Sequence, residues 1–295
     1  MKLITSLFLL AFGATAIHAE VPRVVTSIAP VQGLVSEIMA GVGTPELLLS
    51  EAISPHDFAM RPSQARAIGD ADVIFYVGQH MEPWLEKALQ SREQNELIVA
   101  LGDMPSLHRL EARELNDFGA AHDEHNHDQV FDPHMWLDPE NALLWLDVIA
   151  GVLEIADPEN EALYRRNLEQ SRAEIVATNI SLQSDFSALE GIEMIVTHDS
   201  LQYLEAAFGL KVIGAFTASD GQASGARNMS ELLQHLDSNT CIVEDLTHPS
   251  RIAASLPEDV NHVVVDPLGY AAVGQTGYYS KMLSDIAQSL MECRD

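Results

Sequence analysis

Residues 157–190 read DPENEALYRRNLEQSRAEIVATNISLQSDFSALE, and this stretch decides the fold because it lies between two similar halves of the chain. Asp157 is expected to cap a helix, with Pro158 at the first helical position. Apolar residues recur every seven positions at Leu168, Ile175, Leu182 and Leu189. About 30 residues at 1.5 Å each predict a rod about 45 Å long. We interpret it as a rigid connector lying along both halves; an ordinary long packing helix is the alternative.

Short β-branched runs alternate with helical stretches on both sides of this helix. The strands expected in the first half are Val24–Ile28, Glu46–Ser50, Asp72–Val77 and Leu97–Leu101. Those expected in the second half are Ile192–Thr197, Lys211–Phe216, Cys241–Leu246 and His262–Asp266. Strands separated by helices favour parallel sheets, so we predict an α/β fold with two parallel-sheet lobes joined by the long helix. The expected boundaries are 20–156 for the N-terminal lobe, 157–190 for the connecting helix and 191–295 for the C-terminal lobe.

The first residues are typical of a secretory signal peptide. Met1 and Lys2 precede an apolar stretch from Leu3 to Ile17, and small residues near its end offer cleavage sites. The stretch is short for a membrane span, and no later segment has about 18 consecutive apolar residues. We therefore predict a signal peptide over residues 1–19 and a soluble mature protein in the periplasm.

The net charge of −28 on 295 residues disfavours a nucleic-acid partner, because no basic stripe is available to displace phosphate counterions. An acidic surface can concentrate divalent cations, but solubility explains the charge equally well.

Cys241 and Cys293 are the two cysteines of the sequence. In an oxidising compartment such a pair usually forms a disulfide, and two buried free thiols are the alternative. A bridge would enclose a loop of about 50 residues and stabilise the fold by roughly 4 kcal/mol in the chain-entropy model.

Four residues with metal-binding side chains lie in short polar breaks beside apolar or helical runs, at His56, His134, His198 and Asp266. In open α/β sheets ligands gather beyond the carboxyl ends of the strands, where His56, His198 and Asp266 are expected, and His134 precedes a helix start. Three imidazoles and one carboxylate form a tetrahedral set that suits zinc. We therefore predict a Zn(II) site in the interlobe cleft, with two ligands from each lobe.

Each candidate also has a simpler explanation. A single histidine is more often a surface or core residue than a ligand. Asp266 precedes a proline and is a common turn initiator, in which case water fills the fourth position. Asp138, Asp199 and Glu244 are candidates for the hydrogen bonds that fix a histidine tautomer, although capping or solvated roles explain them equally well.

Several motifs resemble those of the metal-binding solute-binding proteins of ABC importers (cluster A-I). They read SPHDFAMRPS at 54–63, DPHMWLDP at 132–139 and THDSL at 197–201, and DPLG at 266–269 matches the fourth element of that family. The resemblance covers essentially the whole mature chain. Within the family, the chain is most similar to the zinc-uptake, ZnuA-like branch. It implies two α/β lobes, a long backbone helix and an ion in the cleft, with His56, His134 and His198 as the zinc-binding histidines.

The same resemblance bears on the remaining site residues. The manganese branch commonly has a carboxylate in place of His198, so the histidine favours zinc. Cys241 and Cys293 match a disulfide found in many zinc-branch members. Pro55 stands where some members have a glutamate, which makes Asp266 or a water the expected fourth ligand.

Members of this family often carry a long histidine-rich loop before the second ligand. Here it shrinks to residues 120–128, which contain His122, His125 and His127. This patch is either an auxiliary metal-capture loop or a solvated acidic loop.

We therefore expect an extracytoplasmic receptor that captures Zn(II) and delivers it to the permease of an ABC transporter. The permease is a separate chain, because this one has no P-loop and no membrane span. A metallochaperone is a further candidate partner, and we expect a monomer. A zinc hydrolase is the main rival, yet the sequence has no His-Glu-x-x-His helix and no obvious Ser/His/Asp set, so we do not expect an enzyme. An adhesin or metal-storing protein without a transporter is the third alternative.

Two physical expectations follow. Zinc binding requires neutral imidazoles, so the affinity should fall as pH drops through the histidine range. A stiff connecting helix predicts small adjustments of the cleft on metal release and not wide hinge closure.

Overall fold

The computed structural model describes residues 21–90, 92, 97–113, 115, 130–237, 239–250 and 260–294. The predicted signal peptide at 1–19 lies outside the described residues, as do His122, His125 and His127 of the predicted capture loop. Within the described part of the chain, no helix is both long enough and apolar enough to span a membrane.

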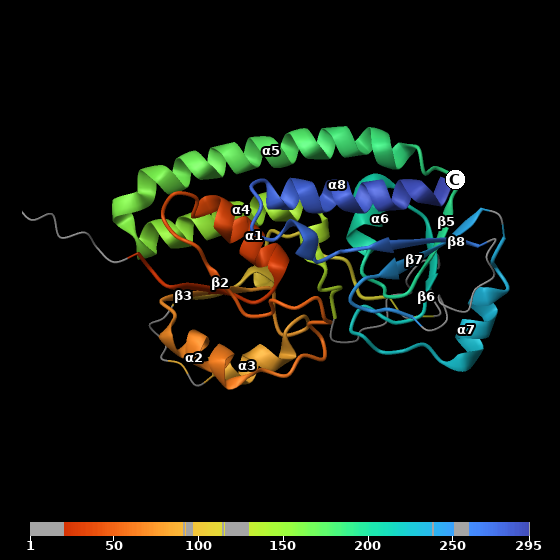
Figure 1. Ribbon diagram of the computed structural model, residues 1–295, viewed down its shortest axis with the longest axis horizontal. Coiled ribbons are helices and arrows are strands. Elements are labelled where there is room, and N and C mark those ends of the chain that lie inside the picture. The colour runs from red at the N-terminus through yellow and green to blue at the C-terminus, as the bar shows by residue number, and fades with distance from the viewer. Residues whose placement is uncertain are drawn as a thin grey trace, which may run out of the picture.

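The chain forms two α/β lobes, each built on a parallel four-stranded sheet (Figure 1). The N-terminal sheet has the order β2-β1-β3-β4, with β1 at Val24–Thr26, β2 at Glu46–Leu47, β3 at Val73–Tyr76 and β4 at Leu97–Ala100. The C-terminal sheet has the order β6-β5-β7-β8, with β5 at Glu193–Val196, β6 at Val212–Ala215, β7 at Thr240–Asp245 and β8 at Asn261–Val265. The predicted fold class is confirmed, and every predicted strand overlaps an observed one.

Helices connect the strands as the parallel topology requires. The N-terminal lobe contains α1 (Ala29–Ile38), α2 (Pro62–Asp70), α3 (Pro83–Leu89) and α4 (Pro139–Ala156). The C-terminal lobe contains α6 (Gln202–Phe208), α7 (Ala226–Leu233) and α8 (Tyr278–Met291). Three of these helices begin with proline, whose fixed φ suits the first turn and whose missing N–H is not needed there. The carboxylate of Asp138 accepts a hydrogen bond from the main-chain N–H of Glu140 (2.9 Å) and so caps α4.

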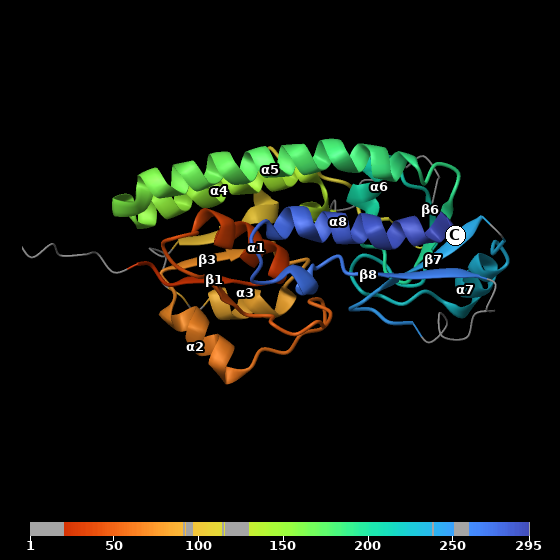
Figure 2. The same ribbon diagram turned by 45° about the horizontal axis from the view of Figure 1, so that its top comes forward.

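The long helix α5 (Glu161–Ser187, 27 residues) runs over both lobes (Figures 1 and 2). It packs on α1 and α4 of the N-terminal lobe and on α6 and α8 of the C-terminal lobe. Its predicted start at Pro158 is wrong by three residues, since Pro158–Asn160 form a 3₁₀ turn. The Asp157 carboxylate does not cap the helix, because it accepts hydrogen bonds from Tyr164 Oη (2.9 Å) and Asn160 Nδ2 (2.8 Å).

The largest hydrophobic core continues through both lobes beneath α5, and each lobe also has a smaller core of its own. The largest core contains Tyr164 and Leu182 from the helix, Trp145 from the N-terminal lobe and Tyr203 from the C-terminal lobe. Hydrogen bonds join the lobes as well, since Trp136 Nε1 donates to the carbonyl of Pro267 (2.8 Å) and Tyr279 Oη donates to that of Trp136 (2.7 Å). The lobes therefore share the largest core and are joined by hydrogen bonds across their boundary.

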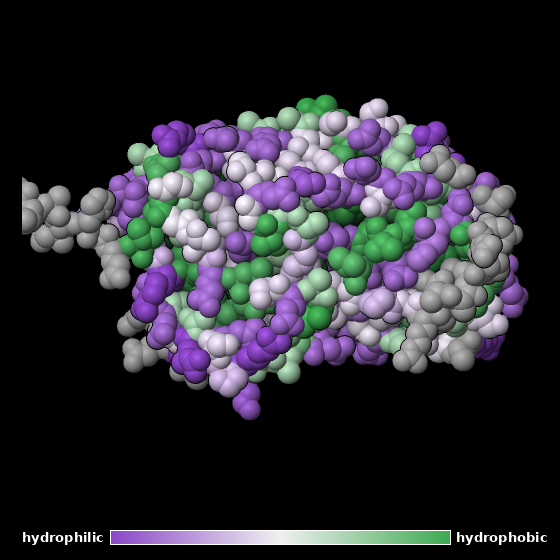
Figure 3. Space-filling view, viewed as in Figure 1, coloured by the Kyte–Doolittle hydropathy of each residue, from purple (hydrophilic) through white to green (hydrophobic). Residues whose placement is uncertain are grey.

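The outer surface is mixed in polarity. On the face shown in Figure 3, hydrophobic residues appear in patches between hydrophilic ones. A few large apolar side chains are exposed singly, among them Ile155 and Ile180, both on the outer helices. Scattered exposures of this kind are normal for soluble proteins and do not by themselves mark a binding site.

The predicted disulfide is confirmed. Cys241, at the start of β7, is bonded to Cys293, just after α8, and both residues are buried. The bridge attaches the last helix to the central part of the C-terminal sheet. It lies at the opposite end of β7 from the edge where the candidate ligands are found.

We predict that replacing both cysteines (Cys241→Ala and Cys293→Ala) lowers the free energy of unfolding by about 4 kcal/mol, because the bridge removes loop entropy from the unfolded chain. Urea unfolding of the metal-free proteins measures the change. Zinc affinity serves as the internal control and should stay within about twofold, since the bridge is remote from the histidines. A loss of stability well below 1 kcal/mol would contradict the prediction.

Candidate metal centre

Three of the predicted ligands meet at the boundary between the lobes. His56 comes from the loop between β2 and α2, His134 stands before the 3₁₀ turn Met135–Leu137, and His198 lies just beyond β5. They are 9 %, 3 % and 2 % exposed, respectively. One side-chain nitrogen of each ring lies within 4.8 Å of the other two. The sequence prediction that a fold-assembled histidine cluster lies between the lobes therefore agrees with the geometry.

The ring spacing suits a single tetrahedral ion. The ring centres are 5.7 Å apart for His56 and His134, 5.5 Å for His56 and His198, and 4.9 Å for His134 and His198. With metal–nitrogen bonds of about 2.0 Å and a ring centre about 1.2 Å behind each nitrogen, tetrahedral imidazoles would have centres about 5 Å apart. The rings are also steeply inclined to one another, at 65° to 75°. The protein therefore holds the three rings near a binding geometry.

Buried carboxylates orient two of the three rings. Asp132 Oδ1 accepts hydrogen bonds from both the main-chain N–H (2.9 Å) and the Nδ1 (2.8 Å) of His134. Asp245 Oδ2, at the end of β7, accepts from Nδ1 of His198 (3.0 Å). A carboxylate bonded to Nδ1 fixes the tautomer and leaves Nε2 available to a metal. The Nε2 atom of His198 is indeed buried with no hydrogen-bond partner among the described residues, as are both ring nitrogens of His56.

The three carboxylates predicted to fix these tautomers are engaged elsewhere. Asp138 bonds to Nδ1 of His108 (2.8 Å). Asp199 pairs with Arg113, and Glu244 pairs with His262 (3.1 Å). In the described residues none of them hydrogen-bonds a candidate ligand, so the tautomer-fixing alternative is wrong, and Asp138 has the capping role that was the other alternative. For Glu244 the reason is the alternation of side chains along β7. Successive side chains point to opposite faces of the sheet, and Asp245, the next residue, is the one that faces His198.

Burial keeps the rings of His56 and His198 neutral. Burial, and then the neighbouring histidines, lower the pKa of His56 to about 2. Burial also lowers the pKa of His198 to about 4, although the hydrogen bond to Asp245 opposes this shift. Burial alone would raise the pKa of Asp245, but its hydrogen bonds from His198 and His248 hold that pKa well below the usual value. The pair His198 and Asp245 is therefore a neutral ring on a charged carboxylate.

These shifts correct the expected pH dependence. An ordinary histidine with a pKa near 6.5 would lose its metal as pH falls through 6. Because the pKa values of His56 and His198 lie at about 2 and 4, these rings need no deprotonation before they bind a metal at pH 5 to 7. The loss of zinc affinity that protonation of His56 and His198 causes is therefore expected at more acidic pH.

We predict that zinc binding at pH 6 releases about one proton or fewer. Three histidines with ordinary pKa values near 6.5 would release roughly two. Here His56 and His198 already lack the proton, so at most a third ligand contributes. Calorimetric titrations in buffers of different ionisation enthalpy measure the number. Release of two or more protons at pH 6 would contradict the lowered pKa values.

Asp266 lies at the same edge of the C-terminal sheet, directly after β8. Its Oδ2 accepts a hydrogen bond from the main-chain N–H of Ala271 (3.3 Å), whereas its Oδ1 is buried without a partner in the described structure. Burial raises the pKa of this carboxyl. Asp266 does not belong to the groups of side chains that are close enough to share an ion, so its role as the fourth ligand stays a prediction.

His248 is a further histidine of the cluster that sequence reasoning missed. It follows β7, and its ring centre lies 3.8 Å from that of His198 and 6.1 Å from that of His56. Together with His198 and Asp245 it forms a second group with atoms near enough to hold an ion. The rule that ligands gather beyond strand ends would have indicated it, because His248 stands three residues after the end of β7.

The cluster borders a hollow between the lobes. This hollow has a volume of about 280 Å³, and its lining includes His80, Arg113, Phe131, Pro133 and Asp220. Gly221, next in the chain, approaches His56 so closely that an added Cβ would lie 3.5 Å from the His56 Cβ. The candidate ligands themselves do not line this hollow, which is bordered by Pro133, the residue before His134.

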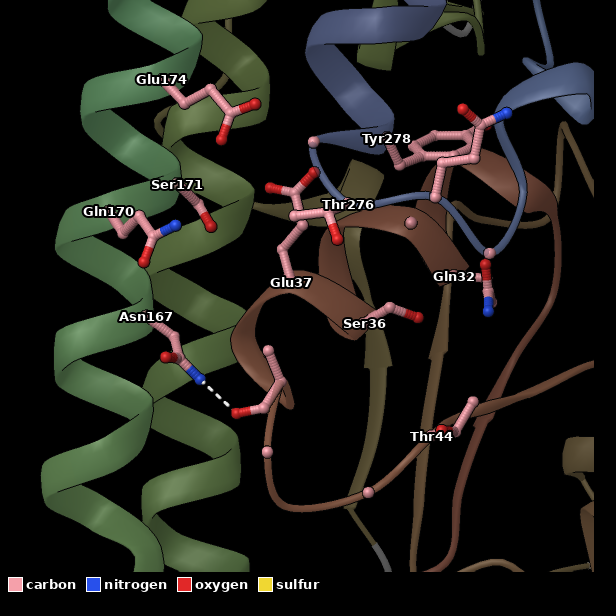
Figure 4. A pocket seen from close by; sticks show the side chains of 17 residues that line it. Gln32, Ser36, Glu37, Thr44, Asn167, Gln170, Ser171, Glu174, Thr276 and Tyr278 are labelled. Atoms are coloured by element: carbon pink, nitrogen blue, oxygen red, sulfur yellow. Dashed lines mark hydrogen bonds between the residues drawn. The ribbon is translucent and has the colours of Figure 1, made fainter.

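A larger hollow, about 320 Å³, lies elsewhere. It is formed by α1, α5 and the segment 274–277, and its polar lining includes Glu37, Asn167, Ser171 and Glu174 (Figure 4). It contains none of the predicted ligands. The histidine cluster, with its unpaired nitrogens, is therefore the better candidate for the functional site.

A buried ion pair connects the lobes directly beside His198. Arg113 of the N-terminal lobe donates through Nε to Asp199 Oδ2 (3.1 Å) and through Nη2 to Glu205 Oε1 (2.7 Å). The side chains of Asp199 and Arg113 are 1 % and 11 % exposed. Tyr203 adds a second connection, since its hydroxyl accepts from the N–H of Leu110 (3.1 Å) and donates to the carbonyl of Asp132 (3.1 Å). These bonds fix the position of His198 relative to His134.

We predict that Arg113→Met destabilises the protein by about 3–5 kcal/mol, because it leaves two buried carboxylates without their cation. Zinc affinity should fall as well, since Asp199 adjoins His198. Urea unfolding and zinc competition measure the two effects. The matched control is Arg227→Met, which removes an exposed arginine paired with Glu231 on α7 and should change neither quantity. Equal behaviour of the two variants would show that the interlobe ion pair contributes nothing.

Comparison with known proteins gives a family match over nearly the whole chain. The family model described as "Zinc-uptake complex component A periplasmic" matches residues 24–293. The high-affinity zinc uptake system protein ZnuA of Paracoccus denitrificans is 31 % identical, over 96 % of this chain and 95 % of that protein. The protein of the same name from Brucella abortus is 30 % identical, over 98 % of this chain and 97 % of its own length.

Solved structures share the fold. A crystal structure of ZnuA superposes with a TM-score of 0.77 at 22 % identity and covers 94 % of this chain and 100 % of that one. A zinc-bound ZnuA with residues 138–173 deleted gives a TM-score of 0.76 at 21 % identity and covers 92 % of this chain and 97 % of its own. The two-lobed arrangement under a long helix is thus shared with other chains of low sequence identity.

Proposed function

Because this chain belongs to the family of periplasmic components A of zinc-uptake complexes, we propose that it captures Zn²⁺ and delivers it to an ABC transporter for uptake. The observation that carries the proposal is the cluster of His56, His134 and His198 at the lobe boundary. Its rings are buried, and those of His56 and His198 are held neutral, as a metal ligand must be. Zinc is the cargo of the protein and not a resident cofactor.

The donor set favours zinc over the harder divalent cations. Imidazole nitrogen suits zinc and its neighbours in the transition series, whereas magnesium, calcium and manganese are better served by carboxylate and water oxygens. The three histidines leave one tetrahedral position, for which the sequence proposes Asp266 or a water molecule. The Oδ1 atom of Asp266 is buried and has no hydrogen-bond partner among the described residues, which supports Asp266 as this ligand.

Transport explains the arrangement better than catalysis does. A zinc hydrolase needs an open ligand position and a free general base beside it. Asp132 and Asp245, which contact the ligand rings, each hold a ring nitrogen by a hydrogen bond and so serve to orient the rings. The named relatives are zinc-uptake proteins, which also supports a binding role.

The remaining assignments follow from the family. We place the protein in the periplasm, where the family description locates its members. The permease and ATPase are separate chains in this proposal, the receptor acts as a monomer, and a metallochaperone is a candidate donor of the ion. Physical association with the permease separates this proposal from an adhesin or a storage protein.

We predict that the chelator-stripped protein binds one Zn²⁺ per chain and prefers zinc to Mn²⁺ in direct competition. His198→Ala should lower zinc affinity by more than the roughly 10–100-fold typical of losing an outer-shell partner, because it removes a ligand. The matched control is His262→Ala, a histidine on β8 that bonds Glu244 away from the cluster and should leave the affinity unchanged. A preference for manganese, or unchanged zinc binding in His198→Ala, would overturn the proposed site.

A further inference from the structure

His248 adds a surplus imidazole to a site that already has three. Its ring lies over that of His198, with ring centres 3.8 Å apart and planes inclined by 31°. Its Nε2 is buried and has no hydrogen-bond partner among the described residues, like the Nε2 of His198. An unpartnered buried nitrogen costs free energy unless it gains a partner in another state of the protein. A bound ion would supply that partner for both rings.

Asp245 and Thr247 orient the two rings. Asp245 Oδ2 accepts from Nδ1 of His198 at 3.0 Å, whereas Nδ1 of His248 lies 3.1 Å from the Thr247 hydroxyl and 3.5 Å from Asp245 Oδ2. The other oxygen of Asp245 accepts from the N–H (2.8 Å) and from the hydroxyl (2.8 Å) of Thr247, which holds the carboxylate in place. With Nδ1 of His198 held by Asp245 and Nδ1 of His248 held by the Thr247 hydroxyl, both Nε2 atoms are left free for a metal. This is the arrangement expected of two ligands oriented by one hydrogen-bond network.

We propose that His248 is a fourth imidazole ligand of the zinc ion, in addition to His56, His134 and His198. This inference rests on the proposed function, because it concerns the same ion in the same cleft. His248 then takes the fourth tetrahedral position in place of Asp266 or a water molecule. Four imidazoles strengthen the preference for zinc, and equally for copper and nickel, over manganese.

Binding requires a small movement of the His248 ring. Rings bound to one tetrahedral ion have centres about 5 Å apart, so the His248 ring must move away from His198 by about 1 Å or slightly more. The surroundings allow this, since the His248 side chain is 14 % exposed whereas that of His198 is 1 % exposed. His248 also follows a turn, and its contact with Asp245 is the longer of the two. His198 thus forms the fixed part of the site and His248 the adjustable part.

The first test is the zinc affinity of His248→Phe, measured by competition with a chromophoric chelator. Phenylalanine keeps an aromatic ring stacked on His198 but has no nitrogen. We expect an affinity loss of at least about tenfold, whereas the control His262→Phe should bind zinc like the unmodified protein. Unchanged affinity in His248→Phe, while His198→Ala still loses zinc, would overturn this inference and leave the proposed function intact. Failure of the unmodified protein to bind zinc would instead overturn the proposed function.

The second test separates ligation from a structural role. In His248→Gly, added imidazole should restore zinc affinity because it can occupy the vacated space and bind the ion. Pyrrole has the same size and shape but no metal-binding nitrogen, and it should restore nothing. Restoration by both compounds, or by neither, would show that His248 only fills space beside His198 and would overturn the inference. Thermal unfolding of the metal-free variant confirms that the fold persists.

Discussion

The exclusion of water from three imidazole rings at the boundary between two lobes is the constraint on which the rest of the structure depends. A buried imidazole that remains neutral and unpaired is costly, so the fold must supply partners for one nitrogen of a ring while leaving the other for a metal. Asp132 and Asp245 do this for His134 and His198. Each carboxylate in turn has main-chain or hydroxyl donors, and the neighbouring Asp199 is neutralised by Arg113. Two of the ligand rings are thus held by carboxylates, and these carboxylates are held in turn by main-chain or hydroxyl donors.

Such a site works only if the lobes keep a constant distance, because ligands from both must meet within a few tenths of an ångström. The continuous core below α5 provides that rigidity, and so do the hydrogen bonds of Trp136 and Tyr203 across the boundary. A hinge that opened widely would expose this shared core to water. That exposure would cost roughly 25 cal/mol of free energy for every Å² of apolar surface. Metal selection must then come from a geometry set in advance and from small side-chain adjustments.

Local patterns predicted the strands and the long helix because each of these elements has a strong periodicity of its own. The candidate histidines were predictable because parallel strands end at one edge of a sheet, which brings residues distant in sequence together. The start of α5 was missed because the carboxylate of Asp157 turns to Tyr164, a choice made by tertiary packing. The orienting role of Asp245 was missed for a similar reason, since it depends on which side of β7 faces His198. His248 could have been found, because it obeys the same strand-end rule as the other histidines.

The release of the ion is the remaining physical problem for such a carrier. Protons compete little for His56 and His198 at pH 5 to 7, because the pKa values of these two rings lie at about 2 and 4. Wide opening is opposed by the shared core. Release therefore requires displacement of a ligand whose support is weakest. Among His56, His134 and His198, the first fits that description, since it lies in the irregular segment between β2 and α2 and has no carboxylate bonded to its ring. A docking surface that moves this segment would remove one nitrogen from the ion while leaving the rest of the fold unchanged.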